Sequence, residues 1–209
     1  MIIVFSGIDG SGKTTCANFA YHHLKGKSLN VRYLHIIRDS FYHKMLHNLI
    51  GRVSKNTKGT LEKKLRTKES GVLSFFSKLA KKTALFINLA LFNLRYGGYK
   101  GNIKRTVIVD RYFYDDIVQG MYLGIAGKRF LDAYKRLIIL PDVIFFLDAD
   151  PVKAYERKQE YDKDYYFRKS IIYKEVYGAI PHLEIAEGSM ENINNIAKGH
   201  LDGAIKKYE

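Results

Sequence analysis

The chain has 209 residues and a formal net charge of +14, from 35 lysines and arginines against 21 aspartates and glutamates. An apolar share of 46% with 13% aromatic residues excludes a mainly disordered chain, and the length suits one domain with a sizeable core. A single cysteine excludes a disulfide framework within the chain and fits a reducing compartment. The first apolar run lacks the basic flank and cleavage site of a signal peptide, and no run is long enough to span a bilayer. We therefore expect a basic, cytoplasmic domain.

Apolar β-branched runs alternate with helical patterns along the chain. In chain order they predict a strand at 2–5, a helix at 13–25, a strand at 31–37, helices at 41–50 and 72–96, a strand at 106–109, helices at 113–122 and 128–139, a strand at 143–147, helices at 151–160 and 165–177, a strand at 182–186 and a helix at 190–207. Three of the strand runs are nearly uniformly apolar, which is typical of parallel strands covered on both faces. The alternation predicts βαβ units and a three-layer α/β sandwich in one domain, residues 1–209.

Most of the excess charge lies in residues 51–105, which hold fourteen lysines and arginines against two glutamates. Within this stretch, residues 52–70 show no clear period and predict a loop or insertion, so we expect a basic insertion at about residues 51–72. Two explanations remain open: an ordinary solvated surface, or a surface that attracts nucleic acid, an anionic membrane or a polyanionic substrate.

The segment Gly7-Ile8-Asp9-Gly10-Ser11-Gly12-Lys13-Thr14 matches G-x-x-x-x-G-K-[ST] between a predicted strand and a predicted helix. Glycines let backbone N–H groups close around phosphate oxygens, and the helix N-terminus adds positive charge. Lys13 would reach the β- and γ-phosphates, and the Thr14 hydroxyl would coordinate Mg²⁺. The pattern therefore predicts a P-loop protein whose ATP-binding residues include Gly7, Asp9, Gly10, Ser11, Gly12, Lys13, Thr14 and Thr15.

An acidic residue and a basic residue follow the predicted strand at 106–109. Asp110 lies at the carboxyl end of a buried strand, where an open α/β sheet binds its ligands. There it can hold magnesium directly or through water. Arg111 offers a planar fork to a second phosphate group. The pair favours a kinase among the P-loop proteins.

With these motifs, the sequence resembles the thymidylate kinase family of nucleoside monophosphate kinases. The resemblance rests on the P-loop with its internal Asp-Gly, on Val109-Asp110-Arg111-Tyr112, on residues 141–148, and on helices bearing Arg157 and Arg168. It covers the chain except for about residues 42–82. It implies a five-stranded parallel sheet of order 2-3-1-4-5 and Mg²⁺-assisted transfer of a phosphoryl group from ATP to dTMP. It also implies a homodimer.

The resemblance implies a role for each matched residue. Asp9 would approach the sugar hydroxyl of the acceptor, Arg111 would hold the acceptor phosphate, and Asp110 would support magnesium. Arg157, helped by Lys158, would begin a LID at about residues 156–169 that closes on ATP. Arg168 would reach in from the far side of the LID. The implied catalytic residues are Lys13, Asp110, Arg111 and Arg157.

The acceptor side departs from the family's pattern. In place of the family's Arg-Glu-Pro-Gly-Gly, the chain has Arg38-Asp39-Ser40, and Arg38 would keep the phosphate-binding role. Counting back from Asp110 without gaps makes Phe86 the aromatic residue that stacks on the base. The arginine expected four residues later is then Ala90.

A shifted register would instead offer Phe92 with Arg95 or Tyr96 as the base-binding residues, and helix core is a further explanation for all these aromatic residues. Asp115 takes the place of a family serine, and Ser170 that of the second LID arginine.

Two other functions therefore remain open: a P-loop kinase of another nucleotide, nucleoside or small molecule, and a non-catalytic nucleotide-binding protein. The latter would bind nucleic acid or membrane through residues 51–105, and it is not favoured.

Overall fold

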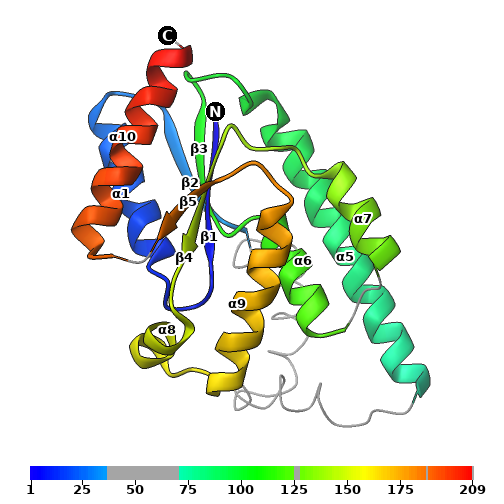
Figure 1. The fold of residues 1–209 in the computed structure, drawn as a ribbon. Helices are drawn as coiled ribbons and strands as arrows, with labels where there is room; N and C mark the ends of the chain where they lie inside the picture. Colours follow the sequence, from blue (N-terminus) through cyan, green and yellow to red (C-terminus); the bar gives the residue numbers. More distant parts are fainter. Residues whose placement is uncertain (37–70, 125–127, 187, 209) are drawn as a thin grey trace, which may run out of the picture.

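The computed structural model describes residues 1–36, 71–124, 128–186 and 188–208, which form a parallel sheet covered by helices on both faces (Figure 1). The strands described are β1 (Ile2–Gly7), β2 (Val31–His35), β3 (Thr106–Asp110), β4 (Val143–Asp148) and β5 (Leu183–Ala186). Their order across the sheet is β2-β3-β1-β4-β5. This confirms the predicted fold class and strand order.

The helices of the described residues follow the predicted ones with small shifts at their ends. They are α1 (Lys13–Gly26), α5 (Gly71–Tyr96), the short η1 (Gly97–Tyr99), α6 (Phe113–Tyr122), α7 (Lys128–Leu137), α8 (Pro151–Lys158), α9 (Lys163–Gly178) and α10 (Met190–Tyr208). The helix predicted at 41–50 and nearly all of the insertion predicted at 51–72 lie outside the described residues. Within the described part, none of these helices combines the length and apolar character needed to cross a bilayer.

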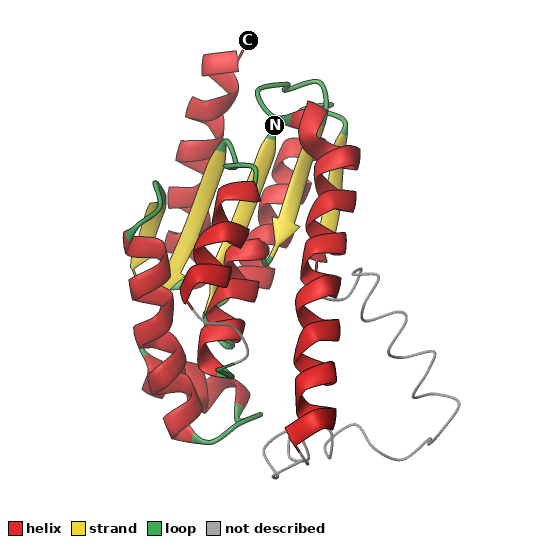
Figure 2. Cartoon of the chain, turned by 90° about the vertical axis from the view of Figure 1, so that its right-hand side faces the viewer, coloured by secondary structure: helices red, strands yellow, loops and turns green. Residues whose placement is uncertain are grey.

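Successive side chains of β1 enter two separate cores, because neighbouring residues of a strand point to opposite faces of the sheet. Ile2 and Val4 contribute to the core beneath α5, α6, α7 and α9. Ile3 and Phe5 contribute to the core beneath α1 and α10. Figure 2 looks onto the first face, with α5 running along the whole sheet. Both faces of β1 are thus buried, as its uniformly apolar sequence predicts.

The helix that follows the P-loop is held between the sheet and the C-terminal helix. Ala17 and Ala20 of α1 are fully buried, and Ala197 and Leu201 of α10 are fully buried in the same core. Small side chains let α1 and α10 approach closely. The position of the P-loop therefore depends on residues near the C-terminal end of the described chain.

Substituting Leu201 by alanine should lower the free energy of unfolding by about 2–5 kcal/mol, because it leaves a cavity in this core. The matched control is Ile196→Ala on the same helix, where the side chain is 38% exposed and the expected loss is about 0.5 kcal/mol. Urea unfolding of both variants measures the difference. Equal losses would contradict the assignment of this core.

Candidate active site

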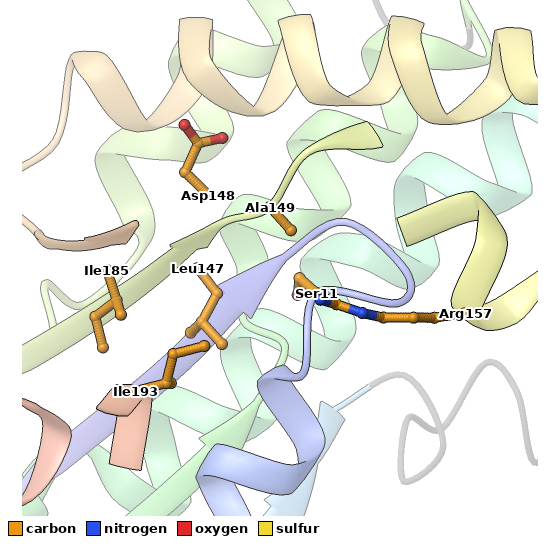
Figure 3. A pocket seen from close by; sticks show the side chains of 7 residues that line it. All are labelled: Ser11, Leu147, Asp148, Ala149, Arg157, Ile185 and Ile193. Carbon is orange, nitrogen blue, oxygen red and sulfur yellow. The ribbon is translucent and has the colours of Figure 1, made fainter. Parts of the chain in front are cut away.

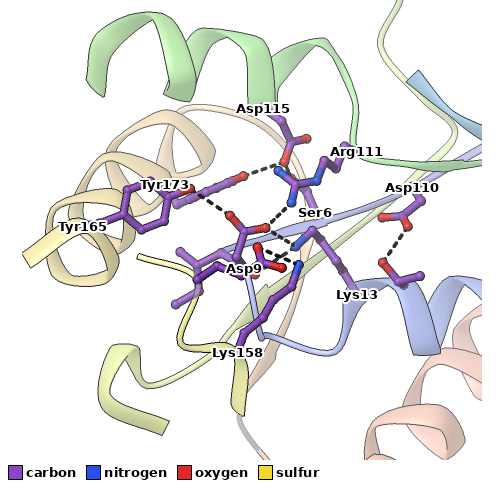
Figure 4. A network of polar contacts seen from close by, with 12 residues as sticks. Ser6, Asp9, Lys13, Asp110, Arg111, Asp115, Lys158, Tyr165 and Tyr173 are labelled. Atoms are coloured by element: carbon purple, nitrogen blue, oxygen red, sulfur yellow. Dashed lines mark hydrogen bonds and ion pairs between the residues drawn. The ribbon is translucent and has the colours of Figure 1, made fainter. Parts of the chain in front are cut away.

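The residues predicted to carry the chemistry meet at one edge of the sheet. In a parallel sheet all carboxyl ends lie on the same side, and ligands bind there. The P-loop follows β1, and Asp110 ends the neighbouring strand β3. Figure 4 shows Asp9, Lys13 and Arg111 pointing toward one another at this edge.

The P-loop has a shape that only glycine allows at two positions. Gly10 and Gly12 have φ angles of +83° and +90°, in the region that residues with a Cβ rarely adopt. A Cβ on Gly10 would lie 2.4 Å from the Ala154 carbonyl oxygen of α8, and one on Gly12 would lie 2.9 Å from Met190 Sδ of α10. The backbone of α8 therefore approaches the loop closely at Gly10, and the Met190 side chain of α10 lies beside Gly12.

Lys13 lies inside the loop whose backbone would hold the phosphates. Its Nζ donates to the Ile8 carbonyl oxygen at 3.0 Å and lies 3.5 Å from Asp9 Oδ1. Burial lowers the pKa of the Lys13 ammonium to about 8, with Arg111 acting in the same direction and Asp9 opposing. The side chain is 5% exposed, so its charge acts in a poorly solvated site.

Thr14 and Asp110 form a small oxygen-rich site. Thr14 Oγ1 donates to Asp110 Oδ2 at 2.7 Å, and the Tyr33 hydroxyl donates to the same oxygen at 3.0 Å. The other carboxylate oxygen, Oδ1, is buried and has no hydrogen-bond partner among the described residues. Mg²⁺ prefers oxygen ligands and is commonly bound by one or two protein groups together with substrate phosphates. These two residues fit such an ion.

An ion pair between Asp9 and Arg111 connects the P-loop to the residue after β3. An Arg111 Nη donates to Asp9 Oδ1, and the Tyr165 hydroxyl donates to Oδ2 at 2.8 Å. The Arg111 backbone has a left-handed φ of +67° and its N–H donates to the Phe5 carbonyl oxygen at 3.0 Å. Such a conformation is uncommon for a residue with a side chain, and it aims the guanidinium at the P-loop.

The charges around Asp9 offset one another. Burial disfavours the charged form of Asp9, but Lys13, Arg111 and Lys169 outweigh burial and hold the pKa of the carboxyl well below its usual range. Burial likewise opposes the Arg111 charge, while Asp9 and other neighbours raise the pKa of the guanidinium. We call Asp9, Lys13, Arg111, Asp115 and Lys169 the Asp9 cluster.

Asp115, which stands where the family has serine, holds three elements together. Its Oδ1 accepts hydrogen bonds of 2.7 Å from the Ser6 hydroxyl of β1 and the Tyr173 hydroxyl of α9. Its Oδ2 accepts one of 2.7 Å from the Tyr112 backbone N–H, at the start of α6. A carboxylate in the first turn of a helix is also favoured by the helix dipole. Sequence reasoning noted this residue as a departure and gave it no role.

The arginines predicted to belong to a LID occupy different environments. Arg157 Nη1 donates to the Gly10 carbonyl oxygen at 3.3 Å, so Arg157 lies against the P-loop. It borders a small pocket whose lining also includes Ser11, Leu147, Ile185 and Ile193 (Figure 3). Lys158, its expected helper, pairs with Glu160 at 3.3 Å.

Arg168 is not brought to the Asp9 cluster in this structure. Its Nε pairs with Asp164 at 2.8 Å on the exposed side of α9, and its side chain is 67% exposed. The next residue, Lys169, points inward and is 4% exposed. Sequence reasoning missed Lys169, although one signal was available. It lies between Tyr165 and Tyr173 at four-residue spacing, which places a lysine on a face of tyrosines.

Of the aromatic residues considered for the base, Phe92 is buried in the core, whereas Phe86 is only partly buried and packs against the edge of the same core. Phe92 is 6% exposed and packs on Tyr112 and Phe113. Phe86 is half-buried and contacts Phe130 edge to face at 5.4 Å between ring centroids. It lines a groove of about 530 Å³ together with Leu79, Lys82, Thr83, Ile87, Ala90 and Phe130. Arg38 lies outside the described residues.

Comparison with known proteins agrees with this geometry. The chain matches the family described as thymidylate kinase over residues 5–198. It is 25% identical over 205 residues to a probable thymidylate kinase of Thermococcus onnurineus, covering 93% of this chain and 94% of that protein. A probable thymidylate kinase of Methanocaldococcus jannaschii is 26% identical over 213 residues, with 96% and 95% of the two chains covered.

A solved structure has the same fold. The thymidylate kinase from Ehrlichia chaffeensis superposes with a TM-score of 0.58 at 20% identity, over 99% of this chain and 98% of that one. The family match spans nearly the whole sequence and includes both the P-loop and the Asp110-Arg111 pair. It confirms the resemblance that the motifs indicated and identifies the chain as a phosphotransferase. The chain belongs to the thymidylate kinase family.

Proposed function

We propose that this protein transfers the γ-phosphoryl group of ATP to dTMP, giving ADP and dTDP. The observation that carries the proposal is the ion pair between Arg111 and Asp9, because it joins the cation expected at the acceptor phosphate to the loop expected at the donor phosphates. A nucleotide switch or a transport ATPase has no need for a second phosphate site beside its P-loop. A kinase that transfers a phosphoryl group between two nucleotides needs both phosphate sites.

The reaction depends mainly on positioning and on neutralising negative charge. The transferred phosphoryl group spreads charge over its oxygens, and cations fixed around it stabilise that charge. In this proposal Lys13 binds the β- and γ-phosphates and Arg111 binds the acceptor phosphate. Arg157 closes over the P-loop as part of the LID, which excludes water and prevents hydrolysis of ATP. Asp9 holds the acceptor's sugar hydroxyl.

Thr14 and Asp110 would hold magnesium. The buried Oδ1 of Asp110 has no hydrogen-bond partner within the described ranges, and the Thr14 hydroxyl lies against Oδ2 of the same carboxylate. When bound, Mg²⁺ neutralises charge on the β- and γ-phosphates. In the described part of the chain no group of three or more acidic, histidine or cysteine side chains forms a separate metal site. This agrees with an ion held chiefly by nucleotide phosphates and water.

Recognition of the acceptor base is assigned to Phe86. It is partly exposed on a groove, whereas Phe92 is buried, so the ungapped register is supported over the shifted one. Ala90 leaves that groove without the arginine that the family pattern expects. A kinase of another nucleotide, nucleoside or small molecule remains the alternative reading. A non-catalytic protein that docks nucleic acid or membrane through residues 51–105 is not favoured.

A homodimer and a cytoplasmic location stay predictions. Outside the groove of Phe86, α5 also exposes Leu91 and Leu94, two apolar side chains that would suit a second copy of the chain. Light scattering at several protein concentrations tests the dimer. The single-domain assignment of residues 1–209 also stays a prediction.

The acceptor is tested with a panel of nucleoside monophosphates in a coupled assay of ADP formation. We expect dTMP to stimulate turnover well above the ATP hydrolysis seen with water alone, since Asp9, Arg111 and the LID match that acceptor. Thymidine, which lacks the phosphate, is the matched negative control. If no monophosphate raises turnover above the rate with water, the proposed function is wrong. If another monophosphate is preferred, the activity class stands and the acceptor assignment changes.

Arg111→Ala should lower kcat/KM for the acceptor by about 10²- to 10³-fold, because it removes a preorganised donor to the phosphate oxygens. KM for ATP should change far less. Arg111→Lys keeps the charge but loses the planar fork, and it should recover only part of the loss. Arg129→Ala, on the exposed surface of α7, is the control. An unchanged kcat/KM for the acceptor would refute the role of Arg111.

Asp110→Asn should raise the Mg²⁺ concentration needed for half-maximal activity by about 10- to 100-fold, because it removes a charge that orients the metal site. Calorimetry of ATP binding with and without Mg²⁺ supplies a second measurement. The control is Asp132→Asn, on the exposed side of α7. Equal Mg²⁺ dependence in Asp110→Asn and the native protein would contradict the assignment.

A further inference from the structure

Lys169 is a buried cation that the reaction as described does not use. It lies on the inward face of α9, and the residue is 4% exposed. Lysine is rarely buried to this degree unless its ammonium is paired. The position of this side chain therefore calls for a physical explanation.

Two tyrosine rings enclose the ammonium. Nζ lies 4.9 Å from the ring centroid of Tyr165 and 5.8 Å from that of Tyr122. Such cation–π contacts stabilise a charge by their electron-rich faces, but they supply no hydrogen-bond acceptor. The rings hold the ammonium in place without accepting hydrogen bonds from its N–H groups.

The neighbouring carboxylates are already occupied by other donors. Asp9 accepts from Arg111 at Oδ1 and from Tyr165 at Oδ2. Asp115 accepts from Ser6, Tyr173 and the Tyr112 backbone. In the part of the chain that the structure describes, the Lys169 ammonium has no hydrogen bond or ion pair, although both carboxylates lie close enough to favour its charge.

Burial and two neighbouring cations oppose the charged form of Lys169. Burial lowers the pKa of its ammonium to about 8, and the Arg111 and Lys13 charges act in the same direction. At neutral pH the group is still a cation. A poorly solvated ammonium whose N–H groups have no acceptor among the described residues is a strong binding group for an anion that enters the site.

We propose that Lys169 Nζ binds the phosphate of the acceptor nucleotide, as a third cation beside Lys13 and Arg111. This deepens the proposed function, on which it rests, and names a residue for its acceptor site. The anion that approaches the Asp9 cluster in a nucleotide kinase is a phosphate, and Asp9 and Arg111 are the residues assigned to the acceptor. Helix α9 thus supplies a cation one residue before Ser170, where the family's second LID arginine is missing.

A structural role and a ligand-binding role make opposite predictions for stability. Lys169→Met keeps the length and the apolar stem of the side chain and removes the charge. If the ammonium only supported the fold, this variant would be less stable. If it serves to bind a phosphate, the midpoint of urea unfolding stays unchanged or rises, because relief of the desolvation of the ammonium offsets the lost attraction to Asp9.

The test compares dTMP with thymidine, two ligands that differ by the phosphate. In Lys169→Met we expect the Kd of dTMP, measured by calorimetry without ATP, to rise about 10- to 100-fold, while the Kd of thymidine stays the same. The KM for dTMP should rise with it and the KM for ATP should not. Lys174→Met, an exposed lysine on the same helix, is the control and should bind dTMP as the native protein does.

The outcomes separate this inference from the proposed function. An active native enzyme together with an unchanged dTMP affinity in Lys169→Met overturns the assignment of Lys169 and leaves the kinase function standing. Equal weakening of dTMP and thymidine also overturns it, because the phosphate would not be what Lys169 binds. Absence of turnover with every monophosphate overturns the proposed function itself. If another monophosphate is the acceptor, the binding test compares that nucleotide with its nucleoside in place of dTMP and thymidine.

Discussion

The placement of β1 between β3 and β4 is the constraint on which the site depends. Phe5 of β1 lies opposite Asp110 of β3, and Gly7 lies opposite Leu147 of β4. The P-loop therefore emerges beside the end of β3, and the Arg111 backbone is tied to the Phe5 carbonyl by a hydrogen bond. In another strand order the same motifs would lie at different parts of the edge. The sheet thus determines the spacing between the P-loop and Arg111 before any side chain acts.

Compensation of buried charge is the second requirement of this site. Three cations and two carboxylates of the Asp9 cluster lie in a region with little solvent, where an unpaired charge is expensive. Asp9 offsets Arg111 and Lys13, and Asp115 joins the cluster to Ser6 and Tyr173. Lys13 and Arg111 share the Asp9 carboxylate, and each can exchange this partner for an anion that enters the site. The same contacts that keep the fold stable therefore leave the cations available to a substrate.

The sequence predicted the fold and the P-loop between a strand and a helix because both depend on local patterns. The P-loop spacing, the uniformly apolar strands and the residue at the end of β3 are each visible within a few positions. Arg168 and Lys169 show where such reasoning stops. The motif pointed to Arg168, but consecutive helical residues lie about 100° apart, so one faces water and the other the cluster. The structural role of Asp115 could not be predicted either, since its partners Ser6 and Tyr173 are brought to it only by the tertiary fold.

The lack of room for a Cβ at Gly10, beside the α8 backbone, and at Gly12, beside the Met190 side chain of α10, has a consequence for how nucleotide affinity is distributed along the chain. A loop confined between two helices has little conformational freedom left to lose, so less of the binding energy goes into ordering it. Part of that preorganisation is contributed by α10, residues 190–208, which carries none of the chemistry. The C-terminal helix is in this sense part of the nucleotide site. Loosening it would weaken binding through entropy, without removing a single contact to the ligand.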